Sequence, residues 1–236
     1  MQQINFLCVG PQRTASSWLD RALRSHPELC FSAHVKETFF FDRNFERGLG
    51  WYFDLFENSK DSSLLGEVGS TYFECAEARQ RIFKHNPSAK IIIMVRNPVA
   101  RSFSSFGHEY TKGRAGEDFF EAVAKQPRIV DSGRYLHLAP KWENAFGRKQ
   151  IFYLMQEDIQ ENPQAQIEAV CSFLGVKPIS LPQELQGKYG QRSVPRYPLL
   201  AAAASRSASA LRGAGMHRVV EIGKKLGLKM VYRGGD

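Results

Sequence analysis

Residues 4–19 read INFLCVGPQRTASSWL. The apolar run Ile4–Val9 predicts a buried β-strand that ends at Gly10. Residues 16–25 predict a helix, since Trp18, Leu19, Ala22 and Leu23 recur on one helical face. A strand, a tight loop and a helix N-terminus in this order are suited to bind an anion, because the helix presents unpaired N–H groups and the positive end of its dipole there.

A second element of the same kind follows about eighty residues later. Residues 90–104 read KIIIMVRNPVARSFS, which predicts a buried strand over 90–96 and a helix over 98–110 with proline in its first turn. Arg96 at the strand end and Ser104 two helical turns on could reach one phosphate together, whereas Arg101 could pair with an acid on the helix surface. Two such sites would suit one nucleotide with phosphates at both ends of its ribose.

Strands alternate with helices along the chain, which predicts an α/β fold with a parallel β-sheet flanked by helices on both faces. We expect one domain over 1–200, a polar loop with one short helix over 111–133, and a basic helical C-terminal appendage over 201–236 packed on the same domain. The further elements that we expect are strands over 64–68 and 151–155 and helices over 76–85, 135–146 and 164–174.

The composition restricts the class of protein. With 236 residues, 43% of them hydrophobic, the chain can bury a substantial core. Apolar runs stay well short of the roughly 18 residues that a membrane span needs, and no leader precedes the first strand. The four cysteines (8, 30, 75 and 171) lack a metal-binding spacing, and we see no other metal-binding cluster. We therefore expect reduced thiols, no metal and a cytoplasmic location, with Cys8 and Cys171 in the core.

The net charge of +8 is concentrated near the C-terminus. Residues 192–236 carry nine Lys or Arg against two acids, a net charge of +7. Such a tail could contact an anionic substrate or a membrane surface, or could be a solvated helix face. It also leaves a nucleic-acid-binding module as an alternative, although we expect no nucleic-acid partner.

The first loop alone leaves several functions open. It lacks the G-x-x-x-x-G-K-[ST] and G-x-G-x-x-G patterns, which disfavours a Walker A kinase and a Rossmann dinucleotide site. It could be an ordinary strand–helix turn with a capping serine. A P-loop-like small-molecule kinase remains the alternative enzyme, and Mg²⁺-ATP binding would favour it.

The two elements together resemble the sulfotransferases that use 3′-phosphoadenosine 5′-phosphosulfate (PAPS), in particular the heparan-sulfate and bacterial carbohydrate type. The family's 5′-phosphosulfate loop has the pattern K/R-x-G-T-T/S-x-L and stands here as residues 13–19. Its 3′-phosphate motif R-x-P-x-x-R-x-x-S is matched at Arg96, Pro98, Arg101 and Ser104. The resemblance extends from about residue 4 to 200 and includes residues 25–28, 36–42, 48–52 and 67–73.

The resemblance implies a sulfuryl transfer from PAPS, leaving 3′,5′-diphosphoadenosine (PAP), to a hydroxyl or amine of a carbohydrate or other small-molecule acceptor. Tyr135 could contact the 3′-phosphate or merely pack, and Arg192 and Arg196 could form a lid over the nucleotide or a surface turn. Sequence departures are Arg13 and Ala15, where the family has Lys and Gly, and Val68, where heparan-type enzymes often have Lys. The cofactor-binding residues implied are Arg13, Thr14, Ala15, Ser16, Ser17, Trp18, Arg96, Ser104, Tyr135, Arg192 and Arg196.

The same resemblance assigns Glu37 as the base that removes the acceptor proton. A carboxylate beside the aromatic run 39–41 would be partly desolvated and therefore a better base. Glu37 could instead be a surface acid paired with Lys36, and His34 is a rival base. Arg13 would stabilise the leaving group, and Lys36 could supply the cation that is missing at position 68.

Overall fold

The computed structural model describes residues 2–56, 63–187 and 207. The chain divides into two compact units, one formed by residues 1–101 and 132–189 and the other by residues 102–131 and 190–236. The predicted boundary between residues 200 and 201 remains a prediction, since all of 201–236 except residue 207 lies outside the described residues.

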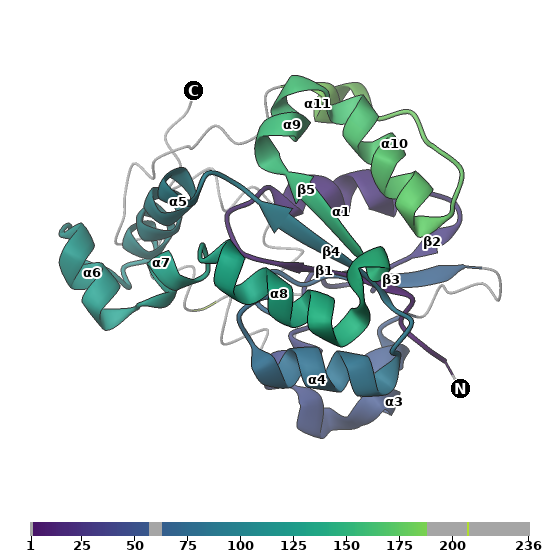
Figure 1. Cartoon of the computed structure of the whole chain (residues 1–236), viewed down its shortest axis with the longest axis horizontal. Coiled ribbons are helices and arrows are strands. Elements are labelled where there is room, and N and C mark those ends of the chain that lie inside the picture. Colours follow the sequence, from purple (N-terminus) through teal and green to yellow (C-terminus); the bar gives the residue numbers. More distant parts are fainter. Residues whose placement is uncertain (1, 57–62, 188–206, 208–236) are drawn as a thin grey trace. The chain divides into compact units, whose positions relative to one another are not determined.

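The first unit is built on a parallel sheet with the strand order β2-β3-β1-β4-β5 (Figure 1). In the register, Phe6 is paired with Gly66 on one side and with Lys90 on the other, while Ile91 is paired with Ile151. This confirms the predicted fold class. The strand bounds are β1 Phe6–Gly10, β2 Leu29–Cys30, β3 Leu64–Val68, β4 Lys90–Val95 and β5 Ile151–Met155.

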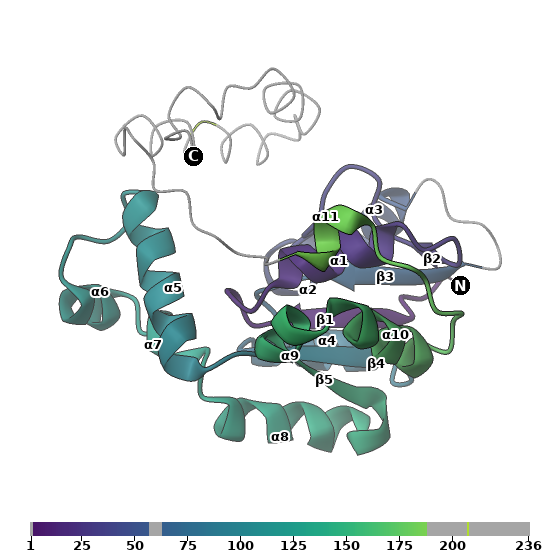
Figure 2. The ribbon, with the colours of Figure 1, turned by 90° about the horizontal axis from the view of Figure 1, so that it is seen from above.

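Helices cover both faces of this sheet (Figures 1 and 2). One face packs against α1 (Ser16–Arg24), α9 (Gln156–Glu161), α10 (Pro163–Leu174) and α11 (Gln183–Gln186). The other face packs against α2 (Phe40–Arg43), α3 (Gly48–Asp54), α4 (Ala76–His85) and α8 (Tyr135–Phe146). The 3₁₀ turns η1 and η2 span Phe45–Arg47 and Arg148–Gln150.

The sequence patterns located the longer elements well. The predicted helices over 76–85 and 135–146 have the bounds found for α4 and α8, and β3 and β5 also match. Trp18, Leu19, Ala22 and Leu23 are buried in the core as their spacing predicted. Cys8 and Cys171 are buried as predicted, and all four cysteines are free thiols. Several elements of two to seven residues were not predicted, namely β2, α2, η1, α3, η2, α9 and α11.

The described part of the second unit is helical. It contains most of α5 (Pro98–Thr111), together with α6 (Phe119–Lys125) and α7 (Arg128–Asp131). The prediction of one short helix over 111–133 was wrong, because α6 and α7 both lie there. Asp118 accepts a hydrogen bond from the Glu121 amide and so caps α6, and Pro127 separates the two helices.

The topology brings several loops to one edge of the sheet. Because β1, β3 and β4 run parallel, their carboxyl ends lie at the same edge, where a ligand site is expected in an open α/β sheet. The segments that leave this edge begin at Pro11, Gly69 and Arg96. No helix in the part of the chain that the structure describes is long and apolar enough to cross a membrane.

Candidate active site

Gly10 closes β1 and begins the loop to α1. Its φ of +99° is unfavourable for other residues, and a Cβ atom there would lie 2.6 Å from the Ser70 carbonyl oxygen. Gly69 also donates its amide hydrogen to the Cys8 carbonyl at 2.9 Å. The segment after β3 is therefore held directly against the loop after β1.

The loop 11–15 is closed by internal contacts. The Thr14 hydroxyl, fully buried, donates to the Pro11 carbonyl at 2.7 Å. Arg13 and Ala15 both adopt left-handed conformations, with φ of 73° and 68°. Ala15 is the N-cap of α1 and provides no side-chain cap, and the first turn of α1 contains no acid. The N-terminus of α1 thus keeps the positive potential that an anion requires.

The structure separates the roles of the predicted phosphate-loop residues. The Trp18 side chain is fully buried, and its indole N–H donates to the Leu185 carbonyl at 3.0 Å, so this side chain supports the fold. The Thr14 hydroxyl already serves the loop. The hydroxyls of Ser16 and Ser17, in contrast, lie where the side chain of Lys36 reaches the loop.

Lys36 joins the loop to the candidate base. Its Nζ atom lies 3.1 Å from Ser16 Oγ, 3.5 Å from Ser17 Oγ and 3.2 Å from Glu37 Oε1. The side chains of Lys36 and Glu37 are 26% and 18% exposed, so both remain accessible to a ligand. Sequence reasoning left open whether Glu37 merely pairs with Lys36; the pair forms, and it lies at the N-terminus of α1.

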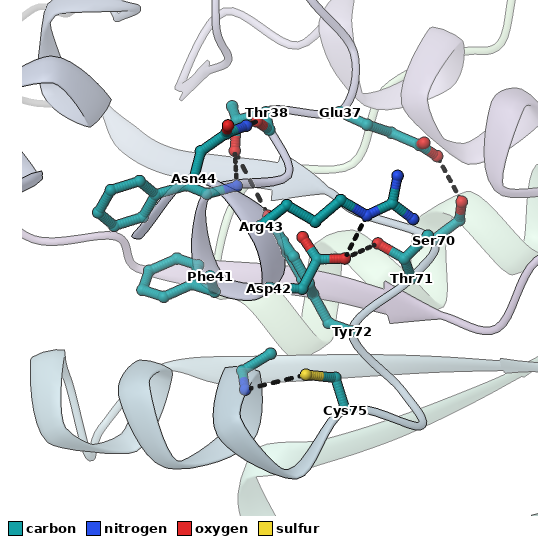
Figure 3. Close-up of polar contacts among 12 residues, drawn as sticks. Glu37, Thr38, Phe41, Asp42, Arg43, Asn44, Ser70, Thr71, Tyr72 and Cys75 are labelled. Carbon is teal, nitrogen blue, oxygen red and sulfur yellow. Dashed lines mark hydrogen bonds and ion pairs between the residues drawn. The ribbon is translucent and has the colours of Figure 1, made fainter. Parts of the chain in front are cut away.

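Glu37 has a second partner that sequence reasoning missed. Ser70 Oγ donates to Glu37 Oε1 at 2.5 Å, and Figure 3 shows the two side chains pointing toward each other. Ser70 lies two residues after the end of β3, in the segment that packs on Gly10. The carboxylate is thus held between an ammonium group and a hydroxyl, with its position fixed relative to the loop.

The segment that carries Lys36 and Glu37 has little regular structure, and Arg24 holds it from α1. Arg24 Nε pairs with Asp20 at 3.0 Å, while its Nη1 and Nη2 atoms donate to the Ser32 and Val35 carbonyls at 2.8 and 3.1 Å. The planar guanidinium can satisfy all three directions at once. Sequence reasoning missed the contacts with Ser32 and Val35, since nothing in the spacing of Arg24 indicates them.

The rival base His34 is exposed in this same segment. Its position two residues before Lys36 keeps it near the site along the chain. The contacts with Lys36 and Ser70 described above are made by the carboxylate of Glu37.

The second predicted anion element contacts the first. Arg96 Nη1 donates to the Arg13 carbonyl at 3.2 Å, and the Arg96 amide donates to the Tyr135 hydroxyl at 3.2 Å. Burial raises the pKa of Tyr135, so this hydroxyl stays neutral at ordinary pH. Arg101 is 1% exposed and its Nη1 lies 3.5 Å from the Gln12 carbonyl, so it is not a surface residue as the alternative prediction had it.

Three predicted cofactor residues lie elsewhere in the chain. Ser104 is on α5 and belongs to the second unit. Arg192 and Arg196 lie outside the described residues.

A family model described as "Sulfotransferase domain" matches residues 3–188, which contain both loops, Lys36 and Glu37. The chain belongs to the sulfotransferase domain family. The match extends over most of the chain and includes every described residue of the site. Neither the small-molecule kinase nor the nucleic-acid-binding alternative is favoured by this membership.

Relatives of known name are similar to this chain in sequence. The human protein named "Heparan sulfate glucosamine 3-O-sulfotransferase 6" is 32% identical over 180 residues, covering 72% of this chain and 52% of that protein. This sulfotransferase-family chain therefore spans about half the length of the curated relatives it matches.

Solved structures share the fold. A sulfotransferase from Alicyclobacillus acidocaldarius superposes with a TM-score of 0.70 at 24% identity, covering 94% of this chain and 97% of the other. Mouse sulfotransferase SULT7A1 complexed with PAP superposes with a TM-score of 0.52 at 15% identity, covering 78% of this chain and 61% of the other. At these identities, the likeness shows a common fold.

Proposed function

We propose that this chain transfers the sulfuryl group of PAPS to a hydroxyl or amine of an acceptor, which we take to be a carbohydrate or a glycosylated metabolite. The observation that carries the proposal is the contact of Lys36 with both the Ser16 hydroxyl and the Glu37 carboxylate. A cradle for an anion and a carboxylate base are thereby adjacent in a member of the sulfotransferase family. The carbohydrate acceptor is supported by the name of the human relative.

The residues present fit such a donor. The N-terminus of α1, free of acids in its first turn, offers N–H groups and the Ser16 and Ser17 hydroxyls to a 5′-phosphosulfate. Lys36 and Arg13 add positive charge at this end. PAPS, when bound, supplies an activated sulfuryl group whose transfer leaves the 5′-phosphate of PAP.

Arg96 and Tyr135 are our candidates for the 3′-phosphate, and the motif resemblance adds Ser104. The same resemblance assigns Arg192 and Arg196 to a lid over the nucleotide. The Arg96 contact with the Arg13 carbonyl supports this assignment, because it couples the two loops that one nucleotide with two phosphates would contact. An arginine fork suits a phosphate dianion, since it can donate two parallel hydrogen bonds.

Glu37 is the proposed base. A general base must lie within hydrogen-bond reach of the proton that it removes, and Glu37 is partly exposed at the edge where the acceptor would enter. Ser70 and Lys36 orient its Oε1 atom, which leaves Oε2 as the atom that we assign to the acceptor proton. His34 remains the alternative base.

We assign to Lys36 the role of the lysine that heparan-type enzymes often have at position 68. Arg13 stands where the family has Lys, and it remains protonated at ordinary pH, so its contribution is electrostatic. Val68, where heparan-type enzymes often have Lys, is fully buried in the core and has no access to a ligand. The ammonium of Lys36 is in place to neutralise charge that develops on the leaving oxygen.

The proposed partners are the acceptor and, for the basic segment 192–236, an anionic substrate or membrane surface. The four free thiols are the state expected in a reducing compartment, which supports a cytoplasmic location within this proposal.

The test begins with calorimetric titration of PAP, followed by transfer from labelled PAPS to a panel of glycans, phenols and lipids. We expect Arg96→Ala to weaken PAP binding by about 10- to 100-fold, as the loss of a charged hydrogen bond to phosphate would. Glu37→Gln should bind PAP like the wild type and lose turnover. Failure of the wild-type chain to bind PAP at micromolar concentration, with binding of Mg²⁺-ATP instead, would replace this function by a kinase.

A further inference from the structure

Glu67 is a buried acid at the end of β3, only 2% exposed. Its Oε1 atom accepts hydrogen bonds from the Thr38 amide at 2.9 Å, the Thr38 hydroxyl at 2.8 Å and the Tyr72 hydroxyl at 2.9 Å. Its Oε2 atom accepts from the Tyr52 hydroxyl at 2.9 Å. Burial of a carboxylate costs free energy unless its oxygen atoms accept hydrogen bonds. Four uncharged donors supply these hydrogen bonds here.

Two of these four bonds hold Thr38, the residue directly after Glu37. The Thr38 hydroxyl also accepts from the Phe40 amide at 3.0 Å. The Thr38 carbonyl accepts from Asn44 Nδ2 at 2.9 Å (Figure 3). The amide, hydroxyl and carbonyl of one residue are thus all bonded. Thr38 is therefore a fixed point of the chain, and it restrains the backbone of Glu37, the residue before it.

The need for such a fixed point follows from the local backbone. Residues 31–39 lie outside the helices and strands, so no ladder of backbone hydrogen bonds holds them. Phe39, next in the chain, has a left-handed φ of 51° at the start of α2. A non-glycine residue adopts this conformation at a cost that its surroundings must offset.

The same strand end reaches Glu37 a second time. Ser70, three residues after Glu67, donates to the Glu37 carboxylate at 2.5 Å. Glu67 therefore fixes the backbone beside the candidate base while Ser70 orients its side chain. Both contacts originate from the end of β3, next to Gly10 and the phosphate loop.

We propose that Glu67 is a positioning residue, which holds Glu37 in register with the phosphate loop through Thr38. The inference rests on the proposed function, since it assumes that Glu37 is the base. A displacement of about 1 Å at a reacting group can cost about 100-fold in rate. Loosening Thr38 should therefore lower kcat without disturbing the nucleotide site.

Thr38→Val removes the hydroxyl at constant shape, and Thr38→Ser restores it. We expect Thr38→Val to lower kcat about 10- to 100-fold, with the dissociation constant for PAP within about twofold of wild type, and Thr38→Ser to recover most of the loss. Glu67→Met should behave like Thr38→Val or worse. Glu67→Gln, whose amide oxygen can still accept from Thr38, should keep more activity than Glu67→Met.

Two tyrosine variants separate positioning from stability. Tyr52→Phe removes a hydrogen bond to Glu67 Oε2, the oxygen that does not contact Thr38. This variant should lower the melting temperature and leave kcat largely unchanged. Tyr153→Phe removes a similar hydrogen bond, which the hydroxyl of Tyr153 on β5 donates to Glu143 on α8. This variant should leave kcat unchanged. Amide hydrogen exchange at Thr38, measured without ligand, should accelerate in Glu67→Met more than in Tyr52→Phe.

The outcomes distinguish this proposal from the function on which it rests. If Glu37→Gln is inactive while Thr38→Val keeps kcat within threefold of wild type, the positioning role is wrong and the base assignment stands. The role is also wrong if kcat falls in proportion to melting temperature in every variant, Tyr52→Phe included. If Glu37→Gln keeps its turnover, the assigned base, and with it this inference, is wrong.

Discussion

The Nζ atom of Lys36 lies 3.1 Å from the Oγ atom of Ser16. The two residues are brought together because the segment after β2 and the loop after β1 leave the same edge of a parallel sheet. The contact places the Lys36 ammonium group at the N-terminus of α1, where the helix dipole already favours an anion. A bound phosphosulfate would replace the serine hydroxyl as the partner of this ammonium group.

Replacing Lys36 by Met should therefore affect turnover more than product binding. Removing one donor that stabilises developing charge costs about 100- to 1,000-fold in kcat, while PAP, which lacks the sulfuryl group, should lose much less affinity. Steady-state kinetics and calorimetry measure the two effects. Lys84→Met, at an exposed position of α4, is the matched control and should change neither. A kcat for Lys36→Met within threefold of wild type would contradict the role.

Arg24→Lys should lower kcat about tenfold while preserving charge, because an ammonium group cannot reproduce the planar fork that contacts Asp20, Ser32 and Val35 together. PAP affinity should stay within twofold, since Arg24 holds the segment bearing the base rather than the nucleotide. The control is Arg21→Lys, one turn away on the exposed face of α1. Equal loss of activity in both variants would show that the contacts of Arg24 with Asp20, Ser32 and Val35 do not support kcat.

Ala15→Gly should stabilise the protein. Ala15 has a left-handed φ of 68°, which costs a residue with a Cβ about 1 to 2 kcal/mol, partly offset by the greater unfolded-state entropy of glycine. The free energy of unfolding in urea should therefore rise by about 0.5 to 1 kcal/mol. Ala22→Gly, in the helical interior of α1, should lower it by about 1 kcal/mol or more. The same sign for both substitutions would rule out backbone strain at position 15.

Cys8 makes stability depend on pH in the alkaline range. Burial raises the pKa of the Cys8 thiol from 9.0 to about 12. Between these values, the unfolded chain loses this proton while the folded chain retains it, so the contribution of Cys8 to stability is full below pH 9 and declines as pH rises toward 12, by about 1.4 kcal/mol per pH unit. Cys8→Ala lacks this titration. The difference in unfolding free energy between wild type and Cys8→Ala should shrink from pH 8 to pH 11. A constant difference would show that the Cys8 thiol does not cause the alkaline loss of stability.

Local patterns were sufficient for the long elements of this fold. The helices over 76–85 and 135–146 and the strand over 64–68 were predicted within their observed bounds, since apolar spacing over five or more residues reflects one buried face. β2 has two residues and α2 four, which is too short for any periodicity to be visible. Their existence depends on neighbours such as β3, whose Leu64 and Leu65 pair with Leu29 and Cys30.

The candidate site divides in the same way. The types of residue at the two loops, basic and hydroxyl side chains after buried strands, could be read from the chain at Arg13, Ser16 and Arg96 and assigned to phosphate binding. The contacts of Ser70 with Glu37, of Arg24 with Ser32 and of Glu67 with Thr38 had no counterpart in the spacing of the sequence. They join residues 33, 8 and 29 positions apart.

What the sequence by itself determined is therefore the class of fold and the positions of the two strand–loop–helix elements, because these depend on local apolar spacing within single segments. The phosphate-binding role of the two loops and the assignment of Glu37 as the base are proposals that rest on the motif resemblance. What only the tertiary structure decided is which groups surround that base. The strand order β2-β3-β1-β4 places the segments carrying Lys36, Ser70 and Arg96 at one edge, and this order arises from packing between distant strands, which no local pattern encodes.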